Sequence, residues 1–141
     1  MTDARILAKH LEWAATSDAG RNQAFNIVNG DIFRWRWLWP KLAADFGIEA
    51  ALYPGRRAPL ELQLADTGLI WAKIAAKNAL AEANLSKLAS AWHTDMDLGR
   101  EIEVVTDMTK SRLAGFHEYQ PTLGSFLDVF AHLRRERIIP A

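Results

Sequence analysis

The 141-residue chain carries 17 lysines and arginines against 17 aspartates and glutamates, so its formal net charge is zero. This balance leaves no broad basic surface for phosphate contacts and argues against a nucleic-acid partner. The absence of cysteine excludes a disulfide framework and a thiolate metal site, and it fits a reducing compartment. No apolar run reaches the roughly 18 to 20 residues that span a bilayer, and the charged start MTDARILAKHLEWAAT does not resemble a signal peptide. We therefore predict one soluble, cytoplasmic domain over residues 1–141, with no membrane contact.

The first predicted element is a helix over residues 3–16, with Thr2 as its expected cap. Its apolar residues recur at helical spacing: Leu7, Leu11, Ala14 and Ala15. Residues 23–28 then alternate in the manner of a short strand, which the turn pair Asn29-Gly30 closes.

A second helix is predicted over residues 33–46, with Asp31 as its cap and Gly47 as its left-handed stop. Pro40 should kink this helix or mark a short first turn. Projection at about 100° per residue places apolar side chains on two opposed faces. One face holds Trp35, Leu38, Trp39, Leu42 and Phe46, and the other holds Phe33, Trp37, Pro40 and Ala44.

A helix that is apolar on two faces is either buried in a large core or held between two bodies. We expect Trp35 and Trp39 to face the core of this chain. Trp37 and Phe33 are then the expected contacts to another domain or to a second copy of the chain. A nucleic-acid clamp lacks the required positive groove, and an interfacial membrane helix would need one broad apolar face.

After a loop over residues 51–59, which is rich in proline and glycine, the pattern again favours short helices. They are expected at residues 60–66, 69–77, 86–92, 107–114 and 123–135. Residues 101–105 could form a brief strand or lead into a helix, and periodicity does not separate the two. The predicted fold class is therefore α+β, mainly helical, with one or two short strands.

The sequence shows no complete active site. Its glycines are too far apart for a dinucleotide fingerprint, and its four histidines show no pair at metal-ligand spacing. The run WHTDMD gathers His93, Asp95 and Asp97, for which a solvated helix end is favoured over a catalytic acid/base pair. We predict no catalytic, cofactor-binding or metal-binding residue in this chain.

Several motifs resemble those of a known family. The stretch AFNIVNGDIFRWRWLWPKLAADFGI at residues 24–48 is similar to a long motif of the progesterone 5-beta-reductase and iridoid synthase-like (PRISE-like) proteins, an atypical branch of the extended short-chain dehydrogenases. The family pattern D-x-x-K-[SA]-R-x-x-G-[FW] is matched from Asp107 to Phe116, and L-R-x-x-x-I-[IV]-P from Leu133 to Pro140. The resemblance runs nearly end to end.

The resemblance implies a C-terminal substrate domain of an enzyme whose full-length form has an α/β Rossmann domain. That N-terminal domain binds NADP(H) and supplies the catalytic Tyr and Lys, and we expect it to be absent here, with no NADP(H) bound by this chain alone. Met1 directly before TDAR suggests a truncated frame, a shortened gene model or an expressed fragment. By the resemblance, Trp92, Met96 and Leu98 are the candidates that line the substrate pocket.

Two functions follow as hypotheses. In the first, the chain is the substrate-binding portion of an NAD(P)H-dependent short-chain oxidoreductase that acts on enones or related small apolar carbonyl compounds, and it does not transfer hydride as an isolated chain. In the second, it is a stand-alone interaction module that oligomerises or docks on a separate Rossmann domain. Whether this chain is itself an enzyme stays open under the first hypothesis.

Overall fold

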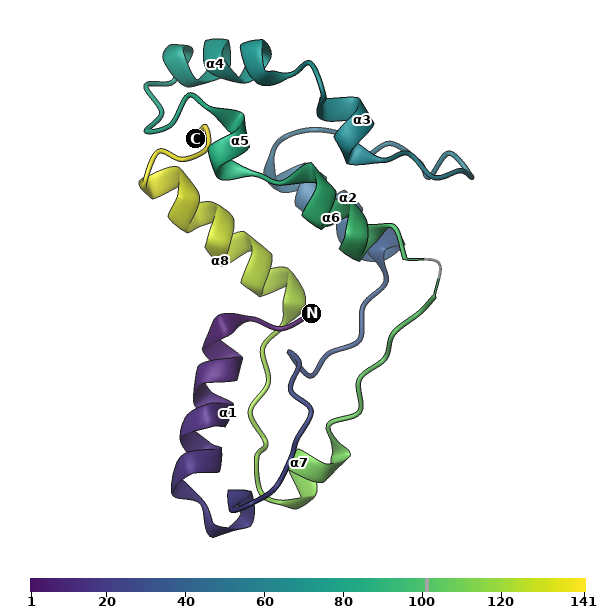
Figure 1. The fold of residues 1–141 in the computed structure, drawn as a ribbon, viewed down its shortest axis with the longest axis vertical. Coiled ribbons are helices and arrows are strands. Elements are labelled where there is room, and N and C mark those ends of the chain that lie inside the picture. The colour runs from purple at the N-terminus through teal and green to yellow at the C-terminus, as the bar shows by residue number, and fades with distance from the viewer. Residues whose placement is uncertain (101) are drawn as a thin grey trace. The chain divides into compact units, whose positions relative to one another are not determined.

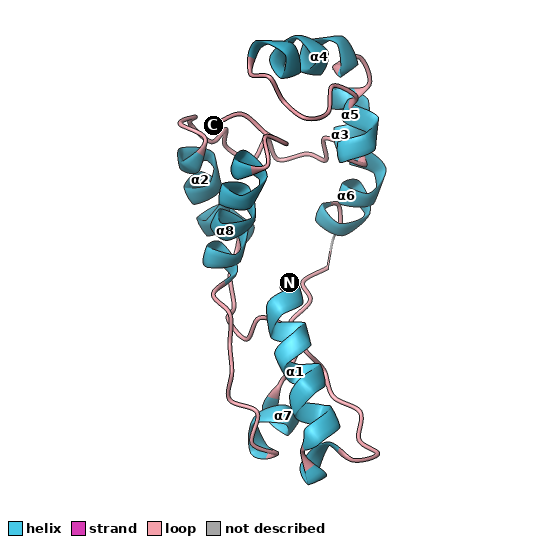
Figure 2. Ribbon diagram, turned by 90° about the vertical axis from the view of Figure 1, so that its left-hand side faces the viewer, coloured by secondary structure: helices cyan, strands magenta, loops and turns pink. Residues whose placement is uncertain are grey.

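The computed structural model describes residues 1–100 and 102–141, and their regular structure is helical (Figure 1). The chain divides into two compact units. Unit 1 comprises Met1–Ala50 and Val104–Asp128, and unit 2 comprises Ala51–Glu103 and Val129–Ala141. No described residue forms a strand (Figure 2), so the predicted α+β class is wrong for this part of the chain. No helix among the described residues has the length and apolar character needed to cross a bilayer.

The predicted strand at residues 23–28 is wrong because no segment among the described residues pairs with it. A strand needs a ladder of backbone hydrogen bonds, and local alternation of side chains does not supply one. Side chains from other segments instead donate to its carbonyls: Lys110 Nζ to Ala24 O, Ser111 Oγ to Asn26 O and Thr2 Oγ1 to Ile27 O. Of the second candidate, residues 101–105, residue 101 lies outside the described residues, and residues 102–105 form neither a strand nor a helix.

Unit 1 is built around α1 (Ala4–Thr16), which is followed by the short 3₁₀ helix η1 (Asp18–Gly20). Its other helices are α2 (Trp35–Asp45), α7 (Thr109–Leu113) and the first half of α8 (Thr122–Arg135). Asp3, rather than Thr2, caps α1, because its carboxylate accepts a hydrogen bond from Arg5 N. Gly47 (φ 67°) follows α2, so the predicted left-handed stop is confirmed, and Gly115 (φ 101°) has the same place after α7.

The core of unit 1 contains Ile6, Met108 and Phe116, with Trp13, Ile27 and Val28 packed against it. The side of α1 that is buried carries Ile6 and His10, whereas Leu7 and Leu11 are exposed. The predicted helix is therefore confirmed, and its buried side is not the one that carries the leucines used to predict it. Both sides of the helix have apolar residues at helical spacing. The buried side is the one that contacts Met108 and Phe116, which lie about 100 residues later in the sequence.

Unit 2 contains α3 (Leu60–Leu64), α4 (Gly68–Lys77), α5 (Leu85–Leu88) and α6 (Ala91–Leu98). Helix α3 packs against α6, and α4 packs against α5. The single helix predicted at residues 86–92 is two helices, because Asn84 caps α5 and Ser90 caps α6 through their side-chain oxygens. Among the described residues of unit 2, Ala75 is the one hydrophobic residue that is fully buried.

Candidate functional site

The three predicted pocket residues lie on α6 in unit 2. Trp92 is 53% exposed, Met96 56% and Leu98 39%. Trp92 and Met96 are four residues apart and share one face of the helix, but Leu98 lies two residues beyond Met96 and projects from a different side. The structure therefore brings two of the three together as an exposed apolar pair, beside the ring of His93 at 4.7 Å from that of Trp92. We call Trp92 and Met96 the α6 face.

The acidic residues of WHTDMD have structural partners. The two carboxylate oxygens of Asp95 accept hydrogen bonds from Leu60 N at 2.8 Å and Glu61 N at 2.9 Å, which caps α3 from α6. These backbone donors, helped by the charge of Arg57, lower the pKa of Asp95. Asp97 pairs with Arg100 at 3.0 Å. The geometry thus supports a helix end with an acidic rim and gives no acid/base pair.

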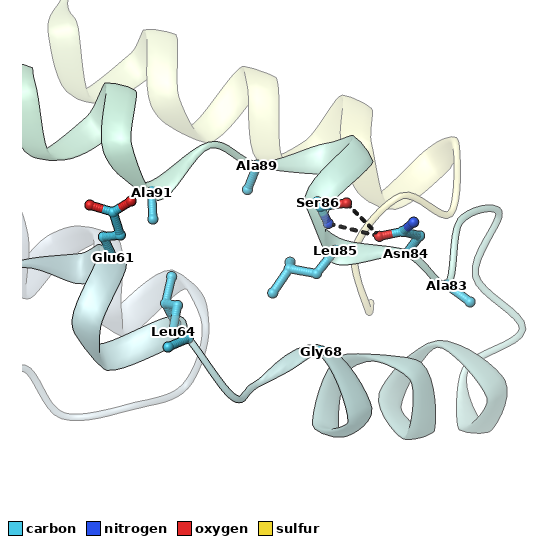
Figure 3. Close-up of a pocket in the computed structure, with 10 residues that line it drawn as sticks. Glu61, Leu64, Gly68, Ala83, Asn84, Leu85, Ser86, Ala89 and Ala91 are labelled. Atoms are coloured by element: carbon cyan, nitrogen blue, oxygen red, sulfur yellow. Dashed lines mark hydrogen bonds between the residues drawn. The ribbon is translucent and has the colours of Figure 1, made fainter.

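Unit 2 also contains a hollow that sequence reasoning missed (Figure 3). It has a volume of about 440 Å³. Its lining comes from α3, the start of α4, α5 and the first residue of α6: Glu61, Leu64, Ala65, Gly68, Ala83, Asn84, Leu85, Ser86, Ala89 and Ala91. The only signal in the sequence is a run of small residues, which ordinary helix packing also uses. None of Trp92, Met96 and Leu98 lines this hollow.

The second predicted surface lies on α2 in unit 1. Leu38 and Leu42 are the buried apolar side chains expected there, whereas Trp35, expected to face the core, is 36% exposed and packs its ring on Phe126. Trp39 is 49% exposed, so the expectation that it faces the core is wrong. The helix continues through Pro40 to Asp45, although proline removes the hydrogen bond that would reach the carbonyl four residues earlier.

Trp37 and Phe33 differ in their surroundings. Trp37 is exposed, with Lys41 Nζ 4.7 Å from the centre of its ring. Phe33 is half-buried and meets the ring of Trp35 edge-on at 5.3 Å. Contact of either residue with another domain or a second copy remains a prediction.

The NGD part of the long motif builds a polar clasp in unit 1, which we define as Asn29, Asp31 and Thr122. Asn29 is buried, accepts from Asp3 N at 2.6 Å and donates to Thr122 Oγ1 at 3.0 Å. Asp31 accepts from both Thr122 N and Thr122 Oγ1. Asp31 therefore holds the start of α8. It was expected to cap α2, for which the residue at the cap position, Arg34, makes no side-chain capping bond.

His10 and Ser111 form a pair that superficially resembles a nucleophile and its base. His10 Nε2 lies 3.1 Å from Ser111 Oγ, but the two residues are only 5% and 1% exposed. The His10 ring contacts Trp13, Phe25 and Phe116, and burial lowers its pKa. No substrate reaches such a pair, so we assign it to packing.

Other site chemistry is also lacking in the described part of the chain. Residues 1–100 and 102–141 hold no group of three His, Cys, Asp or Glu side chains that could bind a metal ion. A dinucleotide pyrophosphate is usually held by a glycine-rich turn between a strand and a helix. The same residues contain no such turn. We therefore assign no residue of this chain to NADP(H) binding.

Comparison with known proteins identifies relatives. No family model matches the chain. It is similar to the (S)-8-oxocitronellyl enol synthases of Nepeta cataria (34% identical over 140 residues), Antirrhinum majus (37% over 139) and Catharanthus roseus (34% over 140). Each alignment covers 98–99% of this chain and 36% of the relative. The chain is thus related to iridoid-synthase-like enol synthases and spans about a third of the length of the curated relatives it matches.

Proposed function

We propose that the chain is the substrate-binding portion of an enol-synthase-like oxidoreductase that acts on a small apolar carbonyl compound such as an enone or enal. The observation that supports this most directly is the near-complete alignment with three enol synthases at 34–37% identity. NADP(H), which the resemblance implies, is proposed to be held by residues outside these 141. The catalytic groups are proposed to lie there too.

The α6 face is the part of the chain that we propose to contact substrate. Trp92 and Met96 offer an exposed apolar surface one helical turn long, which suits the hydrocarbon part of an enone. Leu98 projects to another side of α6 and would contribute only at the rim. Asp95 serves this surface indirectly, because its bonds to Leu60 N and Glu61 N hold α3 against α6.

A titration of the 15N-labelled chain with a ten-carbon enone tests this assignment. We expect shifts in the amides of α6, which weaken in Met96→Ser and Trp92→Ala. The matched control is Leu62→Ser, since Leu62 is an exposed leucine on α3. Equal shifts in all three variants, or none on α6, would contradict the proposed contact.

The cofactor assignment has its own measurement. We expect the fluorescence of NADPH to stay unchanged when the chain is added, and we expect no loss of NADPH absorbance when the enone is added as well. Clear binding or turnover would show that these 141 residues hold the cofactor and would overturn the assignment.

A second function is favoured by the exposed aromatic side chains of α2. Trp37 and Trp39 are both about half exposed, which is unusual unless another surface covers them. As an interaction module the chain would pair with a second copy or with a separately encoded Rossmann domain. Sedimentation velocity distinguishes the homo-oligomer: association that rises with concentration and is lost in Trp37→Ser supports it, and a monomer at all concentrations removes it.

A further inference from the structure

The hollow of unit 2 is a candidate ligand site independent of the α6 face. Its volume of about 440 Å³ falls in the range of small-molecule pockets, which is roughly 300–1,000 Å³. Figure 3 shows the side chains of Leu64 and Leu85 on opposite walls, with Gly68 below them at the start of α4. Four alanines complete the lining, so most of the surface offered to a ligand is apolar.

The polar side chains of the lining are Glu61, Asn84 and Ser86, and of these the Asn84 amide nitrogen can still donate a hydrogen bond. Asn84 Oδ1 already accepts from Ser86 N at 3.0 Å and from Ser86 Oγ at 2.8 Å, so the Ser86 hydroxyl proton is used. Glu61 contributes a carboxylate, which only accepts hydrogen bonds. Figure 3 places this carboxylate at one end of the hollow, beside Ala91.

Within the described residues, no Lys, Arg or His side chain forms an ion pair with the exposed carboxylate of Glu61. Lys87 on α5 pairs with Glu82 at 3.4 Å, and the charge of Arg57 acts on Asp95. The Glu61 backbone N–H is bonded to Asp95, but its side chain has no bond within the described part of the chain. The hollow thus combines an apolar body with one uncompensated negative charge.

From this combination we propose that the hollow binds a small apolar primary amine. Its hydrocarbon part lies between Leu64 and Leu85, and its ammonium group donates to the Glu61 carboxylate. At the Glu61 end a carbonyl oxygen would face an acceptor rather than a donor, and a carboxylate would be repelled. The site therefore differs in ligand chemistry from the proposed substrate contact on α6, and it does not depend on that proposal.

Three probes with one ring test the charge preference: cyclohexylamine, cyclohexanol and cyclohexanecarboxylate. In 15N titrations of the full chain we expect amide shifts around Leu64 and Leu85 with the amine. Binding should be about two- to fivefold weaker for the alcohol, as expected for the loss of one exposed ion pair, and absent for the carboxylate. Amine and carboxylate shifts of equal size, or no shifts at these amides, would overturn the proposal.

Two variants locate the site. In Glu61→Gln the advantage of the amine over the alcohol should vanish, whereas Asp66→Asn, an acidic residue outside the lining, should leave it intact. In Gly68→Leu all binding should be lost. A Cβ at Gly68 meets no atom within 4 Å and its φ is not positive, so the longer side chain can enter the hollow without strain.

The results distinguish the amine site in the hollow from the enone contact on the α6 face. Amine preference that persists in Glu61→Gln, or binding that persists in folded Gly68→Leu, would remove the amine site. Neither result bears on enone shifts along α6, which Met96→Ser tests. Circular dichroism shows whether the helices of Gly68→Leu are intact. If they are not, Glu61→Gln alone tests the amine site.

Discussion

Unit 1 and unit 2 are both built from short, capped helices, but they bury very different surfaces. Unit 1 encloses Ile6, Met108 and Phe116 and ties distant segments together through the Asn29–Asp31–Thr122 clasp. Unit 2 fully buries one hydrophobic residue, Ala75, among its described residues, and leaves Leu62, Leu69 and Trp92 exposed. Helix caps contribute roughly 1 kcal/mol each, whereas a buried aromatic contributes several times as much. The comparison indicates that unit 1 holds its own structure, while the surfaces of unit 2 remain available for ligands.

The largest expected effect is the loss of an aromatic ring from the core of unit 1. Phe116→Ala should lower the free energy of unfolding by about 3–5 kcal/mol, because the cavity left among His10, Trp13 and the core cannot collapse fully. Urea denaturation followed by circular dichroism measures it. Leu62→Ala in unit 2 is the control, and its cost should stay within about 0.5 kcal/mol. Equal losses would mean that the units do not differ as described.

The clasp should come next. Asn29→Ala removes the acceptor of Asp3 N and the donor to Thr122 Oγ1 from a buried position, which should cost about 1–3 kcal/mol. Asn26→Ala is the matched control, because the side chain of Asn26 is exposed and makes one bond, to Asp107 O. Denaturation midpoints that coincide for the two variants would argue against the clasp.

A pH dependence should mark unit 1 through His10. Burial keeps the folded-state pKa of His10 below its ordinary value of 6.5, so as the pH falls below about 6.5 the unfolded chain takes up a proton that the folded chain does not. The contribution of His10 to the free energy of unfolding is therefore present above about pH 6.5 and declines below it. The decline is at most about 1.4 kcal/mol per pH unit for one proton.

Thermal unfolding between pH 7.5 and 5.5 checks this dependence. The fall in melting temperature should be smaller in His10→Phe than in the parent chain, and unchanged in His117→Gln, where the histidine is exposed. An unaltered fall in His10→Phe would assign the pH dependence to other groups.

The smallest effect is expected in unit 2. Asp95→Asn weakens the carboxylate cap on α3, so the amides of Leu60 and Glu61 should exchange with solvent several-fold faster, while exchange in α1 stays unchanged. Asp97→Asn is the control, because the Asp97 carboxylate lies at the surface of α6 and accepts a hydrogen bond from Arg100. Faster exchange in α1 as well would show that the two units open together.

The helices were predictable because their signals are local. Residues 3–16 and 123–135 show helical spacing, and glycines 47 and 115 stop their helices where a left-handed residue is needed. The prediction of a strand at residues 23–28 was wrong, since alternation describes one chain segment and a hydrogen-bonded ladder needs two. The same limit applies to Asp31, which is placed well to cap α2 by sequence but bonds Thr122, 91 residues away.

The candidate site shows a similar division. Trp92 and Met96 share a face because they are four residues apart, which is visible in the sequence. The role of Asp95 depends on α3 lying beside α6, and the hollow depends on α3, α4 and α5 together. No periodicity in residues 60–91 indicates how these helices pack.

The sequence by itself determined the charge balance, the lack of thiol chemistry, the positions of most helices and the resemblance to PRISE-like proteins. These follow from composition and from interactions within a few residues. Only the tertiary structure decided that Ile6 and His10, rather than Leu7 and Leu11, face the core, that Asp31 caps α8, and that Glu61 stands uncompensated beside an apolar hollow. The physical reason is that burial, capping and hydrogen bonding depend on neighbours in space, and the bonded partners of His10, Asp31 and Glu61 lie 34 to 101 positions away.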